Sequence, residues 1–315
     1  MKKLLLSLTV MLFASQMIFA QDAEKKNWTH GGFVGLNVSQ SHFSNWTAGG
    51  QDNVNGLGTF KYNMNYLNGK SKWDNTLDLA LGYSYFDFDE KPVKTDDRIN
   101  LSSLYGYDVV KEKLYVTANL NFQTQFADGF KYDSDSTNRI SAFLAPAYLT
   151  VGLGAQYTPT SWFSLNLAPA SGRLTIVNDQ KLADEGAFGV TAAEYDEAGE
   201  LIKHGKKTRM ELGAQLIANV NYEIFKNVTF SSKLVIFYDY MQTREFNALG
   251  EGHKYKCRFD FDWDNAIVLK VNDWLNCNIT ARLVYDEDIK PIVENSDSFL
   301  QFKEVLSVGI SYKIP

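Results

Sequence analysis

The chain has 315 residues, of which 45% are hydrophobic and 14% aromatic, and its formal net charge is −6. That charge becomes −8 once Lys2 and Lys3 leave with the N-terminal leader described below. An acidic chain without a basic stripe excludes nucleic acid as an expected partner, because phosphates need Lys and Arg to neutralise them. The negative mean hydropathy does not exclude a membrane protein built of strands, since half the residues of such strands are polar.

The first residues have the pattern of a secretory signal peptide. Two lysines precede an apolar core from Leu4 to Phe13, and Ala20 is a small residue at the expected cleavage site. The core is too short to span a bilayer as a helix, and no later apolar run approaches the roughly 18 residues that a membrane helix needs. We therefore expect a signal peptide over 1–20 and one domain over 21–315.

The rest of the chain alternates between apolar and polar residues, which is typical of strands that bury one face. The alternation is clearest over 114–123, where Leu114, Val116 and Leu120 share one face while Thr117 and Asn119 share the other. Twelve strands are predicted, in chain order over 33–43, 56–67, 73–86, 98–109, 114–126, 147–157, 162–177, 209–224, 228–240, 255–271, 275–286 and 299–314.

The connections between these strands alternate in length. Those after the second, fourth, sixth, eighth and tenth strands are tight, and all the others are long. Outer-membrane barrels have short periplasmic turns and longer outside loops, which requires an even number of strands when both termini are periplasmic. The sequence therefore predicts an all-β protein, a transmembrane antiparallel up-and-down barrel of about twelve strands in the cell outer membrane, with both termini in the periplasm.

A soluble β-sandwich also alternates apolar and polar residues and is the competing fold. It gives no reason for every long loop to lie at one end. Trp73, Trp162 and Trp274 each follow a short turn, where an interfacial aromatic girdle is expected. The apolar face of the last strand would be an aggregation-prone edge unless the first strand covers it, as barrel closure does.

The interior of this barrel is predicted to carry charges of both signs. The inward residues are Lys61, Asp74, Asp78, Arg209, Glu211, Lys233, Lys256, Arg258, Asp260, Asp262, Asp264, Arg282 and Lys303. Lys256, Arg258, Asp260, Asp262 and Asp264 form the richest stretch and are the candidate lumen site. The charges either pair and close the interior or line a narrow wet channel. Pairing is favoured, because an unpaired buried charge is very costly. We expect the long connections 127–146 and 178–208 to constrict the outer mouth.

Small residues and prolines mark irregular wall segments. Gly152 and Gly154 point inward and leave room for something to enter the barrel, such as a folded-in loop. Two Ala-Pro-Ala segments, 145–147 and 168–170, should end, bend or bulge a strand, because proline cannot donate to the ladder. Cys257 and Cys277 are too far apart in the proposed hairpin to form a disulfide, since Cys277 falls opposite about Leu269.

The strongest catalytic candidate is the pair His42 and Ser44, which share one face of a strand that should look at lipid. Some outer-membrane acyl hydrolases have this spacing, with the His deprotonating the Ser for attack on an ester. No third residue or oxyanion hole can be assigned, so a polar strand end is the simpler interpretation. The segment 133–137 only faintly resembles a calcium loop. No catalytic residue, metal site or cofactor is therefore predicted.

Several segments together resemble the domain-of-unknown-function 3078 family. They are Ser44–Gly50, Trp73-Asp74-Asn75, Lys94–Arg98, Thr124-Gln125-Phe126 and Ala147–Gly154. The resemblance extends over nearly the whole chain after the leader. It implies an outer-membrane barrel from Bacteroidetes-type Gram-negative bacteria and supplies no activity.

We thus expect a non-enzymatic outer-membrane barrel, acting as a narrow or gated channel or as a structural or binding element. The alternatives are a lipid acyl hydrolase and an accessory subunit of a membrane complex. Outer-membrane lipid is the expected partner. The candidate functional surface comprises Asn45, Trp46, Gly49, Gly50, Lys94, Asp96, Asp97 and Arg98. Its simpler interpretation is loop packing, with glycines for tight backbone and an ion pair between the neighbours Asp97 and Arg98.

Overall fold

The computed structural model describes residues 27–41, 53–86, 91–133, 136–241, 259–286, 288 and 300–315. Strands dominate these ranges, and the helices are single short turns. None of the helices in the described part is long and apolar enough to span a bilayer.

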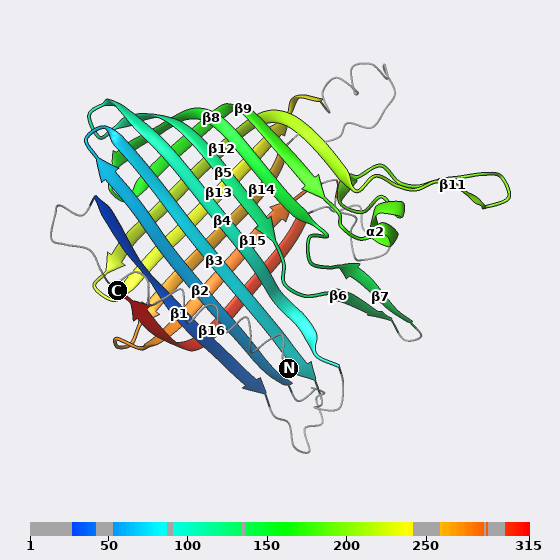
Figure 1. Ribbon diagram of the computed structural model, residues 1–315. Helices are drawn as coiled ribbons and strands as arrows, with labels where there is room; N and C mark the ends of the chain where they lie inside the picture. Colours follow the sequence, from blue (N-terminus) through cyan, green and yellow to red (C-terminus); the bar gives the residue numbers. More distant parts are fainter. Residues whose placement is uncertain are drawn as a thin grey trace, which may run out of the picture.

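Twelve of the described strands form one closed antiparallel barrel (Figure 1), as the sequence predicts. Around the wall they are β1 (Trp28–Ser41), β2 (Asn53–Asn68), β3 (Ser71–Phe86), β4 (Val93–Val110), β5 (Leu114–Thr124), β8 (Ala147–Thr160), β9 (Phe163–Ile176), β12 (Thr208–Phe225), β13 (Val228–Asp239), β14 (Phe259–Lys270), β15 (Leu275–Tyr285) and β16 (Leu300–Ile314). Each strand pairs with its neighbours in the chain order of the barrel strands, and β16 pairs with β1 from Gly32↔Ile314 to Val38↔Val308. This closure removes the free edge and excludes a two-sheet sandwich.

Short and long connections separate to opposite ends of the barrel. The start of β1 and the end of β16 lie at the short-turn end, where Trp28 pairs with Tyr66 just before the turn to β3. The opposite end, called here the outer end, carries additional elements. They are β6 (Gly129–Asp133), β7 (Ser136–Ser141), α2 (Gln180–Asp184), η2 (Ala187–Gly189), β10 (Glu194–Tyr195) and β11 (Leu201–Lys203). In Figure 1 the β10–β11 hairpin projects away from this end.

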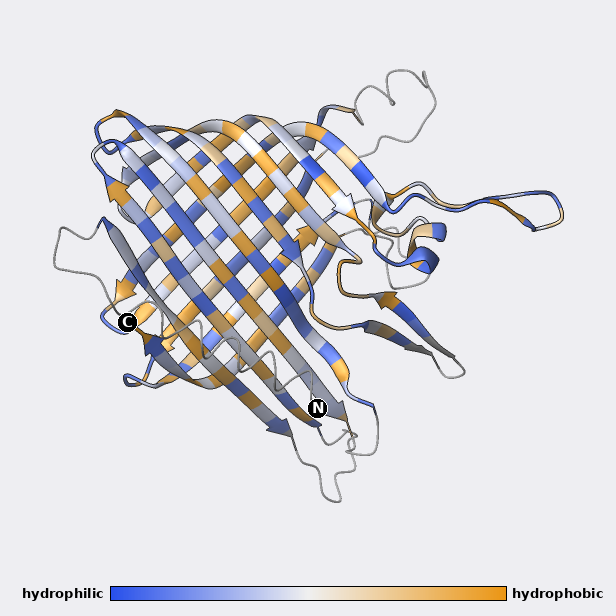
Figure 2. Cartoon of the chain, in the orientation of Figure 1, coloured by the Kyte–Doolittle hydropathy of each residue, from blue (hydrophilic) through white to orange (hydrophobic). Residues whose placement is uncertain are grey.

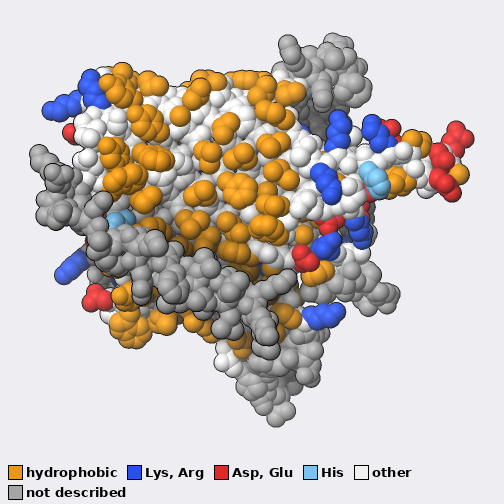
Figure 3. All heavy atoms as spheres, in the orientation of Figure 1, with side chains coloured by type: hydrophobic (Ala, Val, Ile, Leu, Met, Phe, Trp, Pro, Cys, Tyr) orange, Lys and Arg blue, Asp and Glu red, His pale blue; other side chains and the backbone are white. Residues whose placement is uncertain are grey.

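The two faces of the wall differ as the alternation predicts. On β5 the inward Thr117 and Asn119 are buried, whereas the outward Val116 and Leu120 are 57% and 38% exposed. Figure 2 shows hydrophobic and hydrophilic residues alternating along the strands. In Figure 3 hydrophobic side chains spread over the wall in view, and the charged groups lie toward the two ends. The molecule therefore has a hydrocarbon exterior and a polar interior.

Aromatic side chains gather on the outer face at the short-turn end. Trp73 and Trp162 are 40% and 44% exposed. The ring of Trp28 lies 5.7 Å from that of Trp73, and the ring of Trp162 lies 5.6 Å from that of Tyr222. Exposed aromatic rings at this level agree with the girdle that the sequence predicts.

The irregular segments of the wall lie where the sequence places them. The strand β8 begins at Ala147, after the first Ala-Pro-Ala segment, and the pairing of β8 with β9 shifts register beside Pro169 in the second. A side chain at Gly154 would lie 2.0 Å from the carbonyl oxygen of Leu167, and one at Gly152 would lie 2.5 Å from Asn119 Oδ1. The inward space at these glycines is therefore taken by the β9 backbone and a neighbouring side chain, and not by a loop.

The register of the last hairpin also agrees with the sequence. Cys277 pairs with Leu269, and this is the residue that we predicted to lie opposite it. It carries a free thiol. Cys257, the other half of the excluded disulfide, lies outside the described residues.

Candidate functional site

The predicted lumen residues on β14 face the interior and are ion-paired. Arg282 of β15 forms a bidentate pair with Asp262, at 2.9 Å from Nε and 2.6 Å from Nη2, and its Nε lies 3.6 Å from Asp264. Lys233, Asp264, Arg282 and Lys303 stand directly opposite one another on β13 to β16, so alternating strands bring four charges into one row. Lys256 and Arg258 lie outside the described residues.

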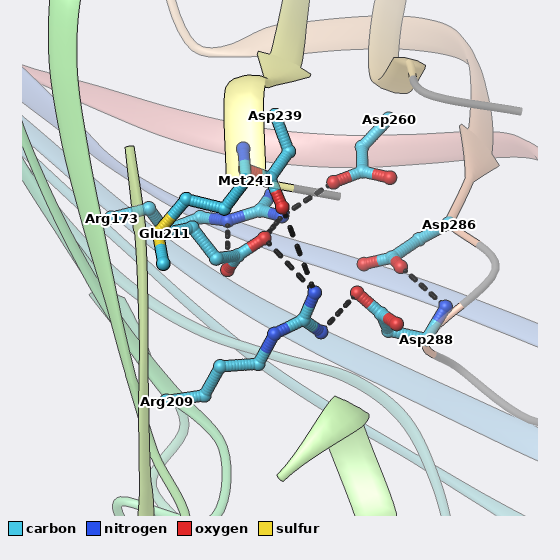
Figure 4. Close-up of polar contacts among 8 residues, drawn as sticks. All are labelled: Arg173, Arg209, Glu211, Asp239, Met241, Asp260, Asp286 and Asp288. Carbon is cyan, nitrogen blue, oxygen red and sulfur yellow. Dashed lines mark hydrogen bonds and ion pairs between the residues drawn. The ribbon is translucent and has the colours of Figure 1, made fainter. Parts of the chain in front are cut away.

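A second cluster lies near the outer end of the lumen, and Figure 4 shows it. At its centre Arg173 of β9 contacts Glu211 of β12, with Nε 2.8 Å from Oε2 and Nη2 2.6 Å from Oε1. The same guanidinium reaches Asp260 of β14 at 2.5 Å and stacks over the ring of Phe237 at 4.4 Å. Because β12 and β13 separate β9 from β14 in the wall, Arg173 ties together strands that are not neighbours.

Arg209 extends this cluster toward the outer mouth. Its Nη2 lies 3.5 Å from Glu211 and 3.9 Å from Asp239, and its Nη1 donates to Asp288. The backbone N–H of Asp288 in turn donates to Asp286 at 2.8 Å. Burial raises the pKa of the Asp286 carboxyl, which follows the last residue of β15.

We call this group the mouth cluster; its charged members are Arg173, Arg209, Glu211, Asp239, Asp260, Asp286 and Asp288. Two arginines face five carboxylates, so the cluster carries an excess of negative charge when the carboxylates are ionised. Glu211 is 3% exposed and Arg173 12% exposed at the side chain, which shields their ion pair from water. An excess of carboxylates at a mouth attracts cations.

The sequence found part of the mouth cluster. Arg209, Glu211 and Asp260 were predicted to face inward, and they do. The other four members, Arg173, Asp239, Asp286 and Asp288, were missed. Arg173 alternates with the inward Thr175, but the register shift beside Pro169 hides this alternation from the sequence.

Uncharged side chains close the lumen beside β5, β8, β9 and β12. Asn119 of β5 donates to Gln215 of β12 at 2.9 Å, and Asn166 donates to Thr117 at 2.8 Å. All four residues are at most 8% exposed. Asn119 reaches Gln215 over Gly152, where a side chain would collide with it. On this side of the barrel the interior is a packed polar layer.

The connections at the outer end share a small hydrophobic core. Ala142 and Ala145, in the connection between β5 and β8, pack with Val177, Leu182 and Val190, in the connection between β9 and β12. The backbone N–H of residue 178 donates to the carbonyl of residue 144 at 2.8 Å, which joins the two connections.

The connection between β9 and β12 reaches the mouth cluster. A side chain at Gly189, in η2, would collide with the guanidinium of Arg209 and with Asp288.

Near α2, Asp184 accepts from Gln180 at 2.8 Å and from the backbone N–H of Gly205 at 2.7 Å. The hydrogen bond from Gln180 is the largest cause that holds the pKa of Asp184 below its ordinary value, and His204 acts in the same direction.

Part of the candidate functional surface is organised around a largely buried ion pair. Lys94 lies 2.9 Å from Asp97 and donates to Gln125 at 3.3 Å and to the carbonyl of Ala127 at 2.8 Å. Asp97 also accepts from the backbone N–H groups of Phe126 and Ala127 at 2.7 and 2.9 Å. Two motifs of the family resemblance, 94–98 and 124–126, therefore meet here.

The other residues of this surface have separate roles. Asp96 faces the lumen and pairs with Lys303 of β16 at 2.5 Å. Arg98 pairs with Asp78 at 3.3 Å, so Asp97 and Arg98 each have other partners rather than one another. Asn45, Trp46, Gly49 and Gly50, together with the catalytic candidates His42 and Ser44, lie outside the described residues.

No metal site emerges from the described part of the chain. No three His, Cys, Asp or Glu side chains there are arranged to hold an ion. The segment 133–137, which faintly resembles a calcium loop, includes residues 134 and 135, which the structure does not describe.

The fold defines the class of the protein as a closed up-and-down β-barrel with a polar interior and an apolar outer wall. The model of the family described as "Protein of unknown function (DUF3078)" matches residues 38–130. This match confirms, over that segment, the family resemblance that the sequence motifs indicate. No curated protein matches the chain.

Solved structures similar to the chain are barrels of remote sequence. The translocator domain of the autotransporter NalP from Neisseria meningitidis is 9% identical, with 93% of this chain and 90% of that chain covered and a TM-score of 0.38. The NanC porin is 11% identical, with 90% of this chain and 98% of that chain covered and a TM-score of 0.37. The COG4313 outer membrane channel from Pseudomonas putida F1 is 8% identical, with coverages of 93% and 99% and a TM-score of 0.37.

Proposed function

We propose that this protein is an integral outer-membrane barrel that acts as a narrow, gated channel with a preference for small cations. The apolar wall supports the location. A continuous exposed hydrocarbon surface is unfavourable in water and stable in a bilayer, where a closed barrel satisfies every backbone hydrogen bond. Both termini would then be periplasmic, because they lie at the short-turn end.

The mouth cluster is the observation that carries the channel proposal. Its guanidinium groups bridge strands across the lumen, and the segment carrying η2 covers it from outside. A passage of this kind opens only when the ion pairs rearrange. The five carboxylates against two arginines supply the preference for cations.

Planar-bilayer recording of the purified, detergent-extracted protein tests the proposal. We expect small, intermittent conductance, and a reversal potential in a KCl gradient that indicates K⁺ over Cl⁻. The variant Arg173→Met should raise the open probability or the conductance, because it removes the bond to Asp260 across the lumen. The variant Lys111→Met, in a short turn at the opposite end, is the matched control and should behave like the wild type.

Two results would refute the proposal. A large, permanently open pore in the wild type would contradict the gate. A wild type and an Arg173→Met variant that both fail to conduct would favour the structural or binding role. A requirement for detergent and a heat-dependent shift in gel mobility establish the barrel independently of conductance.

A further inference from the structure

The lumen has a packed side and an open, charged side. On the packed side, formed by β5, β8, β9 and β12, Asn119 and Gln215 bond to one another and are 8% and 5% exposed. On the other side, Asp264 of β14 and Arg282 of β15 are 43% and 30% exposed at the side chain. The space left to an ion below the mouth cluster is therefore the part of the lumen that β1 to β4 and β13 to β16 line.

Lys61 of β2 faces this open side, and the carboxylate beside it is held by an arginine. In the pairing of β2 with β3, Lys61 stands directly opposite Asp78. Asp78 is bound instead by Arg98 of β4, with Nη2 3.3 Å from Oδ1. The nearest carboxylate along the wall is thus engaged by a guanidinium, and the ammonium group of Lys61 is left over.

Lys233 of β13 is in the same position on the opposite part of the wall. It stands directly opposite Asp264 in the pairing of β13 with β14. Arg282 lies on the other side of Asp264, with Nε 3.6 Å from Oδ1, and the same guanidinium forms the bidentate pair with Asp262. An arginine again occupies the carboxylates that a lysine could have neutralised.

Lys61 and Lys233, called here the lumen lysines, approach one another across the lumen. Neither makes a hydrogen bond or an ion pair with any residue that the structure describes, and both are half-buried. Four strands, β1, β16, β15 and β14, separate β2 from β13 along the shorter way round the wall. The charges of Lys61 and Asp78 nevertheless act on Lys233. Two ammonium groups without an ion pair therefore stand on either side of the space that remains for an ion.

We propose that the lumen lysines are specificity-determining residues of the channel, which favour anions and oppose the cation preference of the mouth cluster. The inference rests on the proposed function, since it requires that ions pass. At the mouth, five carboxylates against two arginines attract cations. Farther in, two ammonium groups repel cations and attract anions. A cation that enters easily thus meets a second, unfavourable step, and the wild type prefers K⁺ over Cl⁻ only moderately.

Reversal potentials of the purified full chain in planar bilayers, recorded in a KCl gradient, test the inference. A unit charge about 4 Å from an ion in water changes the local concentration of that ion about fivefold. We expect Lys61→Met and Lys233→Met each to raise the K⁺ to Cl⁻ permeability ratio about three- to fivefold, and the double variant to raise it about tenfold. Both single variants should fold, because methionine leaves no bonded partner behind.

Charge-conserving and displaced variants are the controls. Lys61→Arg and Lys233→Arg keep the positive charge and should keep the wild-type ratio. Lys226→Met removes a lysine from the exposed short turn just before β13 and should also leave the ratio unchanged. Heat-dependent gel mobility checks the fold of each variant. The two methionine variants test the inference independently, so misfolding of one leaves the other to decide.

The inference is overturned if the methionine variants keep the wild-type permeability ratio, or if the arginine variants shift it as far as the methionine variants do. An equal shift in Lys226→Met would also overturn it, because the effect would then come from the net charge of the chain. A channel that conducts and opens further in Arg173→Met, but whose ratio ignores both lysines, loses only this inference. If neither the wild type nor Arg173→Met conducts, the proposed function fails as well.

Discussion

The substitution Arg173→Met tests whether the mouth cluster holds the barrel together as well as closing it. Methionine keeps the length and packing of the side chain but removes both hydrogen bonds to Glu211 and the bond to Asp260. The carboxylate of Glu211 then stays buried, at 3% exposure, with only Arg209 near it at 3.5 Å. An uncompensated buried charge is the main cost.

The magnitude follows from this geometry. Breaking a buried ion pair by removing one partner costs about 3–5 kcal/mol. Because Arg209 still partly compensates Glu211, we expect about 3 kcal/mol of lost unfolding free energy for Arg173→Met. Glu211→Gln should cost less, about 2 kcal/mol, since Arg173 keeps its bond to Asp260.

Urea unfolding in lipid vesicles, followed by tryptophan fluorescence, measures these free energies. The double variant with both substitutions completes a thermodynamic cycle, and it should be at least about 1 kcal/mol more stable than the sum of the single costs predicts. The interpretation is refuted if the two effects add within error, or if Arg173→Met costs less than about 0.5 kcal/mol. Either result would mean that water already solvates this ion pair.

Three further predictions concern other parts of the wall. Asp97→Ala should cost about 2 kcal/mol and expose residues 125–146 to protease, because it frees two backbone N–H groups; equal sensitivity of Asp96→Ala would argue against this specific role. Gly154→Ala should cost at least about 3 kcal/mol or abolish folding, since its side chain would meet backbone at 2.0 Å, whereas Gly172→Ala should stay within about 0.5 kcal/mol in the same unfolding assay. The pKa of Asp184 is lowered in the fold, so its stabilising effect is complete above its ordinary pKa of 3.8 and disappears as the pH falls through its lower folded value. Protection factors for hydrogen exchange at residues 180–207, which are corrected for the intrinsic pH dependence of exchange, should therefore fall at low pH in the wild type and be low at all pH values in Asp184→Asn; identical protection profiles would show that this carboxylate stabilises nothing.

The two sequence motifs at 94–98 and 124–126 illustrate the limit between local and tertiary information. The sequence singles out both, but it offers no reason for them to meet. Their contact depends on the register of β4 with β5, in which Ile99 pairs with Thr124 and so brings Asp97 level with Phe126. A register is a relation between two segments and is not encoded in either one alone.

The sequence by itself determined the barrel and its strand order, because the period of two and the alternation of short and long connections are local properties of the chain. It also determined which charges face inward on regular strands, such as Asp262 and Arg282. Only the tertiary structure decided which charges pair across the lumen. Arg173 meets Asp260 because closure curves β9 toward β14, and a register shift beside Pro169 sets the direction in which Arg173 points. Contacts across a closed cylinder depend on its curvature, which no single strand specifies.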